Sequence, residues 1–240
     1  MGKKAICFLM VLMATIVSVP LCVLAQDCAG YYLFVNKAEY ELIHYDKKDK
    51  LTGRVYHKIT SVNSSPTKTE ATIHSKRHGE EGNLTTEGDY TVYCQEGSVF
   101  IDIGIMVNPD LLEAHQNADI KIQGDQLEYP STLAVGQTLK DGSSTIDVLD
   151  KKNGQILSSI VVTITGRTVS EKESINVPAG AYNAYKIKQD MEIRTRTDMN
   201  KQVTRLQIVE YFAPGIGMVR SESYKNGKLI AYSVLSKANK

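Results

Sequence analysis

Strict alternation of charged and apolar residues marks the segment from Tyr185 to Thr197. Its even-numbered positions, from Lys186 to Arg196, are all charged, and its odd-numbered positions are mostly apolar or β-branched. A period of two puts the two sets on opposite faces of an extended strand, whereas helical spacing would spread the charges around the axis. The pattern therefore predicts a long antiparallel strand with one face in water and the other on a core.

The rest of the chain continues this extended pattern. Residues 155–167 are partly apolar on both alternating faces, and residues 203–212 carry apolar side chains on one face. Short runs of the same kind predict further strands. They are Tyr40–Tyr45, Arg54–Val62, Lys68–Ser75, Tyr90–Cys94, Val99–Ile105, Ile146–Leu149, Met218–Tyr224 and Lys228–Leu235.

Two Asn-Gly pairs separate predicted strands. Asn226-Gly227 and Asn153-Gly154 each lie between two apolar runs. Asn and Gly both tolerate positive φ, which the tight turns of β-hairpins require. Each pair therefore predicts a hairpin.

One segment, Asn108–His115, is predicted to be a short helix. Asn108 can cap it, Pro109 suits the first helical position, and Asp110 places an acid in the first turn. About a dozen strands with one short helix predict an all-β, mainly antiparallel fold. We expect a single large curved sheet, a roll or half-barrel, forming a single β-rich domain over residues 26–240.

The N-terminus has the pattern of a secretory signal peptide. Lys3 and Lys4 precede an almost wholly apolar run that ends near Pro20, and Val23-Leu24-Ala25 resembles a cleavage site. A transmembrane anchor is the competing interpretation, since the run is borderline for a span. Pro20 and the cleavage-like site favour a signal peptide over residues 1–25, and no transmembrane anchor in the mature form.

Two cysteines near this site raise the question of a lipid anchor. Lipidation requires a small residue directly before the modified cysteine, but Leu21 precedes Cys22 and Asp27 precedes Cys28. We therefore expect an exported protein without a lipid, periplasmic or else extracellular or at the cell surface.

The charge balance excludes one class of partner. The chain has 28 basic and 27 acidic residues, and the predicted signal peptide contains two of the basic ones, Lys3 and Lys4, and no acid. The mature chain would therefore carry 26 basic and 27 acidic residues, a net charge of −1. Nucleic-acid binding needs a concentrated basic surface, so no nucleic-acid partner is expected.

Cys28 and Cys94 are the two cysteines that remain after processing. In an oxidising compartment such a pair favours a disulfide, which would close a loop of about 67 residues and contribute roughly 4 kcal/mol. Two buried thiols are the alternative. We predict a Cys28–Cys94 disulfide, which would fix the mature N-terminus.

No metal site is predicted from the histidines. His74 and His78 have the spacing of a helical metal site, but on a strand they would lie about 13 Å apart. His44 and His57 fall on consecutive predicted strands and could face each other, without a third ligand. We expect all four to be ordinary surface residues, and we expect no cofactor.

No catalytic residue is predicted either. The sequence lacks a Gly-x-Ser-x-Gly elbow and a His-Glu-x-x-His motif. Asp89, Asp102 and Glu210 could pair only in a register that the sequence does not reveal, so we expect them to be solvated acids. We do not expect an enzyme.

A curved antiparallel sheet could instead hold an apolar ligand on its concave face. The apolar face of Tyr185–Thr197, together with Leu206, Ile208 and Phe212, is a candidate wall, with the helix Pro109–His115 as a plug. The alternative, a filled core, gives the same alternation and is favoured.

Two segments resemble a known family. Residues 175–187 read INVPAGAYNAYKI, and residues 210–222 read EYFAPGIGMVRSE. Together they are similar to TapB-like proteins, uncharacterised exported proteins of Bacteroidetes grouped with domains of unknown function. The similarity is best over residues 134–235. It implies a β-rich roll in the cell envelope, similar in shape to periplasmic lipid carriers, and it transfers no catalytic residue.

The leading hypothesis is therefore a non-enzymatic periplasmic binding or scaffolding protein that holds an apolar or lipid-like ligand on a curved β-sheet. One alternative is a structural or assembly component of the envelope that contacts other proteins through a sheet edge. A hydrolase with an unrecognised site is the other.

Overall fold

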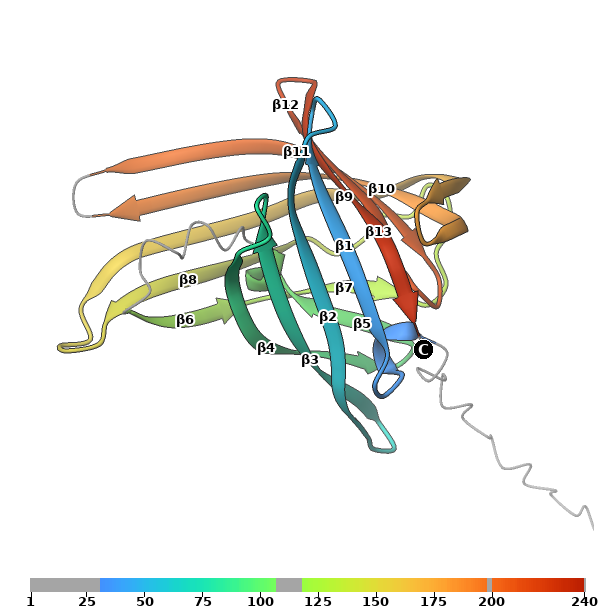
Figure 1. Cartoon of the computed structure of the whole chain (residues 1–240), viewed down its shortest axis with the longest axis horizontal. Helices are drawn as coiled ribbons and strands as arrows, with labels where there is room; N and C mark the ends of the chain where they lie inside the picture. The colour runs from blue at the N-terminus through green and yellow to red at the C-terminus, as the bar shows by residue number, and fades with distance from the viewer. Residues whose placement is uncertain (1–30, 107–117, 198–199, 240) are drawn as a thin grey trace, which may run out of the picture.

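A computed structural model describes residues 31–106, 118–197 and 200–239. Within these residues, thirteen strands form one antiparallel sheet that curls around a core (Figure 1). The strands are β1 (Glu39–Asp46), β2 (Leu51–Ser64), β3 (Lys68–Gly79), β4 (Leu84–Gln95), β5 (Ser98–Asp102), β6 (Ala118–Gly124), β7 (Gln126–Pro130), β8 (Gly142–Asp150), β9 (Ile156–Val177), β10 (Gly180–Thr197), β11 (Lys201–Ala213), β12 (Gly217–Lys225) and β13 (Lys228–Asn239). Two short 3₁₀ turns, η2 (Tyr32–Phe34) and η3 (Ile103–Met106), complete the described elements.

The strand order is almost the order of the chain. It runs β6-β8-β9-β10-β11-β12-β13-β1-β2-β3-β4-β5-β7, so that β13 pairs with β1 and brings both ends of the described chain together. The two edge strands, β6 and β7, are consecutive in sequence. The Asp125 backbone N–H, between them, donates to the Ser143 carbonyl at 2.8 Å, and the Ser143 N–H donates to Asp125 Oδ2 at 3.0 Å. These bonds hold the two edges of the sheet near each other, so the sheet forms a nearly closed roll.

The predicted all-β curved sheet is thus confirmed. The alternation of Tyr185–Thr197 is seen in β10, where Ile187 and Met191 are buried while Lys188 and Asp190 are exposed. The predicted hairpin at Asn226-Gly227 joins β12 to β13, with both residues at positive φ. The signal peptide of residues 1–25, Cys28 and the helix Asn108–His115 lie outside the described residues. Cys94 is fully buried on β4.

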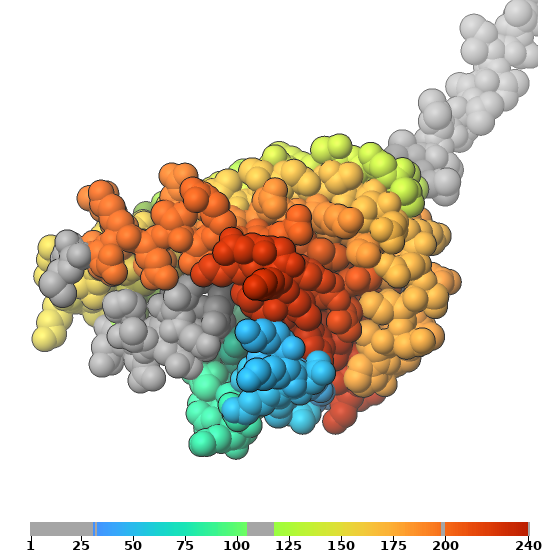
Figure 2. Space-filling model, turned by 90° about the horizontal axis from the view of Figure 1, so that it is seen from above, coloured from blue at the N-terminus to red at the C-terminus, as the bar shows by residue number. Residues whose placement is uncertain are grey.

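A second apolar cluster covers part of the outer face. The long strands β9 and β10, of 22 and 18 residues, bend so that their hairpin lies against the C-terminal strands (Figure 2). The Ala179 backbone N–H at the tip donates to the Leu235 carbonyl on β13 at 3.2 Å. Beneath the hairpin, Val209 and Val234 point outward and are at most 6% exposed. The sheet is therefore covered on both faces at this point.

Candidate functional site

The concave face of the roll is tightly filled over β8, β9 and β10. Large aliphatic side chains point inward there and touch across neighbouring strands, and all are 9% exposed or less. They include Ile146, Ile160, Val162, Ile164, Ile187 and Met191. This half of the interior is an ordinary close-packed core; we call it the filled half.

Over β12, β13 and β1 to β4, the inward side chains differ from those of the filled half. One cross-strand row runs from Glu210 through Ser221, Ser233 and His44 to Gly53. Opposite residues of an antiparallel pair lie on the same face, so the whole row points inward. Small side chains leave space, and a cavity of about 830 Å³ lies over these strands. We call this region the hollow half; its volume suits a small-molecule or lipid chain.

The walls of the cavity are apolar and aromatic with a few polar groups. The exposed residues Thr52, Thr86 and Asp89 lie at its rim. The apolar lining is Leu33, Leu42, Val55, Ile101, Phe212, Ile216, Met218 and Leu235, and the polar lining includes Tyr40, His44, His57, Ser75, Arg77, Tyr90, Tyr129, Glu210, Ser221, Ser223 and Ser233.

A buried polar network lies where the filled half meets the hollow half. Arg167 of β9 is fully buried; its Nε donates to Gln189 Oε1 at 3.0 Å, and its Nη1 donates to the carbonyls of Glu128 and Lys140. Because Glu128 belongs to the edge strand β7, this guanidinium connects β9 to β7 where the sheet has no backbone ladder. Gly166, at a φ of 66°, lies where the β9–β10 register shifts, and this bulge directs Arg167 inward.

The same network continues to the cavity wall. Gln189 Nε2 donates to Glu210 Oε1 at 3.1 Å, and the Tyr129 hydroxyl donates to Glu210 Oε2 at 2.9 Å. Burial raises the pKa of Glu210, and the charge of Arg167 opposes this shift. Tyr129 also stacks on Phe212, with ring centroids 4.9 Å apart. Glu210 is only 1% exposed, so the prediction of a solvated acid is wrong at this position.

An aromatic cluster occupies the opposite wall. The Tyr40 and Tyr90 hydroxyls are 3.0 Å apart, Tyr90 Oη is 3.2 Å from His57 Nδ1, and the Tyr40 ring stacks on His57 at 4.4 Å. Burial lowers the pKa of His57 to about 3, helped by the charge of His44. Burial raises the pKa of Tyr90 to about 12. His57 and Tyr90 are therefore neutral near pH 7.

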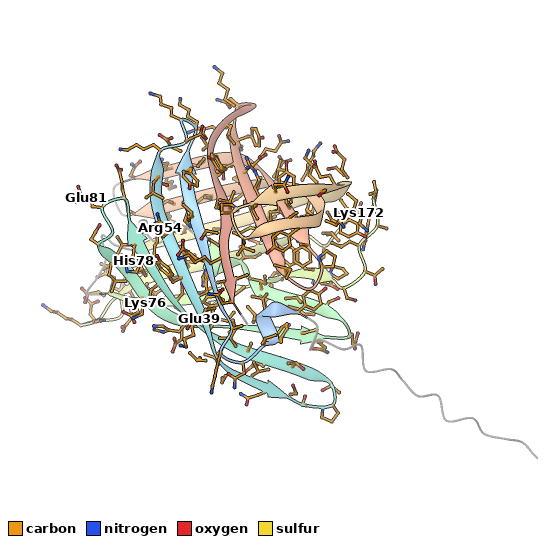
Figure 3. The ribbon with its side chains drawn as sticks, turned by 45° about the vertical axis from the view of Figure 1, so that its right-hand side comes forward. Glu39, Arg54, Lys76, His78, Glu81 and Lys172 are labelled. Carbon is orange, nitrogen blue, oxygen red and sulfur yellow. The ribbon has the colours of Figure 1, made fainter. Side chains whose placement is uncertain are left out.

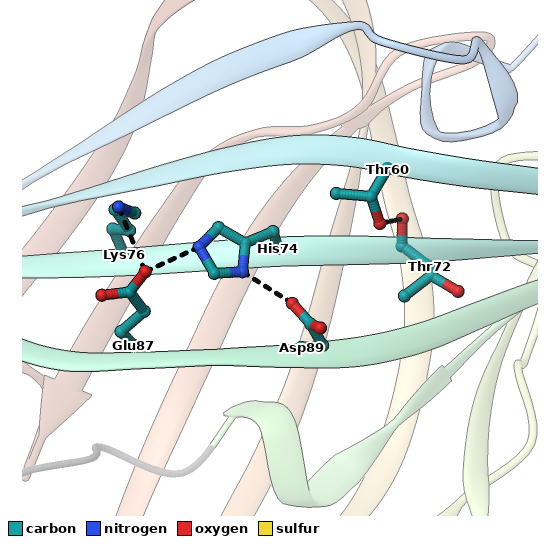
Figure 4. A network of polar contacts seen from close by, with 6 residues as sticks. All are labelled: Thr60, Thr72, His74, Lys76, Glu87 and Asp89. Atoms are coloured by element: carbon teal, nitrogen blue, oxygen red, sulfur yellow. Dashed lines mark hydrogen bonds and ion pairs between the residues drawn. The ribbon is translucent and has the colours of Figure 1, made fainter.

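The outer face of β3 and β4 carries three of the candidate residues, His74, His78 and Asp89. His74 Nδ1 lies 2.6 Å from Asp89 and its Nε2 lies 2.9 Å from Glu87, which also pairs with Lys76 (Figure 4). The carboxylate of Asp89, followed by that of Glu87, raises the pKa of His74. The two ring nitrogens face different carboxylates, so the arrangement is an ion-pair cluster.

His78 lies farther along β3 than His74, beside Arg54 of β2 (Figure 3), and its ring meets that of Tyr56 edge-on with centroids 5.4 Å apart. His44 and His57 do not face each other directly, since their cross-strand partners are Gly53 and Tyr40, but both line the cavity. Within residues 31–106, 118–197 and 200–239, no group of three or more His, Cys, Asp or Glu side chains could hold a metal ion.

The candidate wall proposed from the sequence is mostly filled core. Ile187, Met191 and Ile208 belong to the buried cluster, and only Phe212 lines the cavity. Asp102 caps the Gly104 N–H at 2.7 Å, close to its own turn. The serines of β12 and β13 were not predicted to line a site. The alternation of serine at positions 221 and 223 was the signal in the sequence that could have indicated a polar row on one face of this strand.

No helical segment of the described residues has the length and apolarity to cross a bilayer.

Comparison with known proteins gives one family: the model of the DUF3108-like family matches residues 37–235. No protein with curated annotation matches the chain.

Two solved structures are similar over nearly the whole chain. A candidate exported protein of Bacteroides fragilis with a YmcC-like fold has a TM-score of 0.71 at 24% identity, covering 88% of this chain and 99% of that chain. A candidate lipoprotein of Parabacteroides distasonis has a TM-score of 0.74 at 26% identity, covering 89% of this chain and 100% of that chain. The name TapB occurs in none of these matches.

Proposed function

We propose that this chain, which belongs to the DUF3108-like family, is a non-enzymatic binding protein that holds an apolar or lipid-like ligand in the hollow half of its roll. The single observation that carries the proposal is the cavity of about 830 Å³ beside a well-packed core. An interior that is closely packed on one side and open on the other favours a binding site over an accident of packing.

The composition of the walls supports a ligand that is apolar over most of its length. Leu42, Val55 and Leu235 contribute aliphatic surface, and Phe212 contributes an aromatic ring. Burying an acyl or prenyl chain against such surface gains about 25 cal/mol per Å² removed from water. The polar groups are few and clustered, as in sites that fix the orientation of a ligand.

Export of the chain is part of the proposal. The basic start, the apolar run and the cleavage-like Val23-Leu24-Ala25 support a signal peptide over residues 1–25. One similar structure is described as a candidate exported protein and the other as a candidate lipoprotein. We place the mature protein in the periplasm without a lipid anchor, because Leu21 and Asp27 do not suit lipidation of the cysteines that follow them.

Titration of residues 26–240 with the apolar dye N-phenyl-1-naphthylamine tests the binding site. We expect saturable fluorescence enhancement with one site per chain. Ser233→Phe should weaken binding at least about tenfold, because its ring occupies space that the dye needs. Ser233 is inward-facing and lines the cavity, and Ser221, its cross-strand neighbour, provides a second filling variant, Ser221→Phe.

Ser159→Phe is the matched control. Ser159 is half-buried and pairs with Asp147 and Arg196 on the outward face of the filled half, so the same substitution leaves the cavity unchanged. Circular dichroism and a thermal melt confirm that each variant folds. Dye binding that is absent from the wild type, or equal in folded Ser233→Phe, Ser221→Phe and Ser159→Phe, rules out the cavity as the site.

A second candidate function rests on the edge strand β6. Among the described strands it pairs with β8 alone, and its Ile120 and Ile122 are 46% and 41% exposed. Exposed apolar residues on an edge strand favour pairing with another chain. This supports the alternative of an assembly component of the envelope. Sedimentation of the wild type and of Ile120→Lys, together with cross-linking of both proteins in the envelope, tests this alternative. It is contradicted if the wild type is monomeric at all concentrations and if Ile120→Lys keeps every cross-linked partner of the wild type.

A further inference from the structure

One group of polar side chains in the cavity offers hydrogen bonds without a charge. In the cluster of Tyr40, Tyr90 and His57, whose side chains are in contact, His57 and Tyr90 are neutral near pH 7, since the pKa of His57 is about 3 and that of Tyr90 about 12. A neutral imidazole has one donor and one acceptor nitrogen, and a phenol hydroxyl can donate or accept. The chain of contacts from Tyr40 to His57 can therefore serve either a donor or an acceptor on a ligand.

Serine hydroxyls on the neighbouring strands β12 and β13 add to this capacity. Ser221 and Ser233 are cross-strand neighbours, Ser223 follows on the same face, and all three line the cavity. Among the described residues these three hydroxyls have no hydrogen-bond partner. Polar groups on an enclosed surface normally have partners, so this row is suited to a ligand that supplies them.

The charged residues near the cavity oppose an anionic ligand. The carboxyl of Glu210 lies in the wall beside Ser221, and its counter-charge, Arg167, lies behind it, outside the lining. At the rim, Arg77 and Asp89 have opposite signs. A phosphate or carboxylate placed in the cavity would lose its hydration without gaining an unshared cation, which is costly.

We propose that the cavity selects an amphipathic ligand whose head group is uncharged and forms hydrogen bonds, such as an acylglycerol, over an anionic lipid with the same chain. This inference rests on the proposed binding function and names the chemical class of its ligand. The apolar walls hold the chain, and the serine row with the Tyr40–Tyr90–His57 cluster holds the hydroxyl and ester groups of the head.

Displacement of N-phenyl-1-naphthylamine by two lipids tests the proposal. The probes are 1-monooleoylglycerol and 1-oleoyl-lysophosphatidic acid, which differ only in the phosphate, each used below its critical micelle concentration at pH 7.5. We expect the neutral lipid to displace the dye at a concentration at least about tenfold lower, because the phosphate must be buried without a counter-ion. Equal displacement, or tighter binding of the phosphate, overturns the proposal while the binding function stands.

Removing the hydroxyls gives a second, independent readout. Ser221→Ala with Ser233→Ala should weaken 1-monooleoylglycerol at least about fivefold and leave the dye, which has no hydroxyl or ester group, unchanged. Ser159→Ala, on the outward face, is the matched control and should change nothing. An unchanged affinity for 1-monooleoylglycerol in the folded double variant contradicts the role of the serines. A wild type that binds neither dye nor lipid removes the proposed function itself.

Discussion

The filled and hollow halves belong to one sheet and obey the same alternation, yet the first is closely packed and the second contains a cavity. In Figure 1 the strands β8 to β11 run across the view, while β1 to β4 and β13 run down it. The inward positions hold Ile160, Val162 and Ile164 on the first set, and Ser221, Ser233 and Gly53 on the second. Volume at the inward positions, and not the pattern of polarity, decides whether a curved sheet encloses a core or a cavity.

The boundary between the halves is held by polar contacts. Arg167 anchors the filled side, and Glu210 and Tyr129 form part of the cavity wall. A buried charge is tolerated there because the guanidinium has three hydrogen-bond acceptors. The contrast between the halves can be tested by substitutions on each side of this boundary.

Arg167→Ala should have the largest effect. It leaves Gln189 Oε1 and the carbonyls of Glu128 and Lys140 without their donor and the Glu210 carboxyl without the nearby charge of Arg167, which we expect to cost about 3–5 kcal/mol of unfolding free energy. Urea denaturation measures this. Arg205→Ala removes a largely exposed arginine of β11 and should cost less than about 1 kcal/mol. Equal losses of unfolding free energy in Arg167→Ala and Arg205→Ala would show that the boundary network stabilises the fold no more than a surface ion pair does.

Matched valines compare the two halves directly. Val162→Ala, in the filled half, should lower the unfolding free energy by about 2–3 kcal/mol, since Val162 is fully buried among aliphatic side chains. Val55→Ala enlarges a space that already exists and should cost about 1 kcal/mol or less. Urea midpoints of both variants give the difference. If Val55→Ala costs as much as Val162→Ala, the hollow half is packed like a core.

His57 should make the stability of the hollow half depend on pH. Its folded pKa of about 3 lies below the unfolded value of about 6.5, so its contribution is complete above pH 6.5 and is lost as the pH falls towards 3. The fall in unfolding free energy between pH 7.5 and 4.5 should be smaller by about 2.5 kcal/mol in His57→Gln than in the wild type. Parallel pH profiles for the two proteins would mean that the imidazole is solvated.

His74, on the outer face of the same strands, should show a small effect of the opposite sign. Its pKa is raised by Asp89 and Glu87, so its contribution is present below the unfolded value of about 6.5 and is lost as the pH rises through the folded pKa. His74→Gln should be less stable than the wild type at pH 5.5 and equal to it at pH 8.5. Thermal melts at both pH values check this, and a deficit only at pH 8.5 would contradict the ion-pair cluster.

Sequence patterns predicted most of the strands, but not the two edge strands β6 and β7, and they were insufficient for the interior. Period-two alternation and the Asn226-Gly227 turn predicted β10 and the last hairpin, because both are local properties. The cavity depends on contacts between distant segments: Tyr129 meets Glu210 across 81 residues, and only the register of four strands brings Glu210, Ser233 and His44 into one row.

A bulge explains why the burial of Arg167 cannot be read from the sequence pattern. Gly166 shifts the β9 register, so that the inward set changes from even to odd positions and Arg167 points into the core. Simple alternation along residues 155–167 would have assigned Arg167 to the outward face. Gln189, on the apolar face of β10, was the one sign in the sequence that a polar group is buried there.

Native mass spectrometry of the protein purified gently from its own cell envelope tests the central claim most directly, because it reports what the hollow half holds. We expect a monomer carrying an extractable neutral lipid of a few hundred daltons, about the size that the cavity of about 830 Å³ admits, and we expect this lipid to be lost in Ser233→Phe. A bare mass for the wild type, or an adduct that persists unchanged in the folded variant, would contradict it.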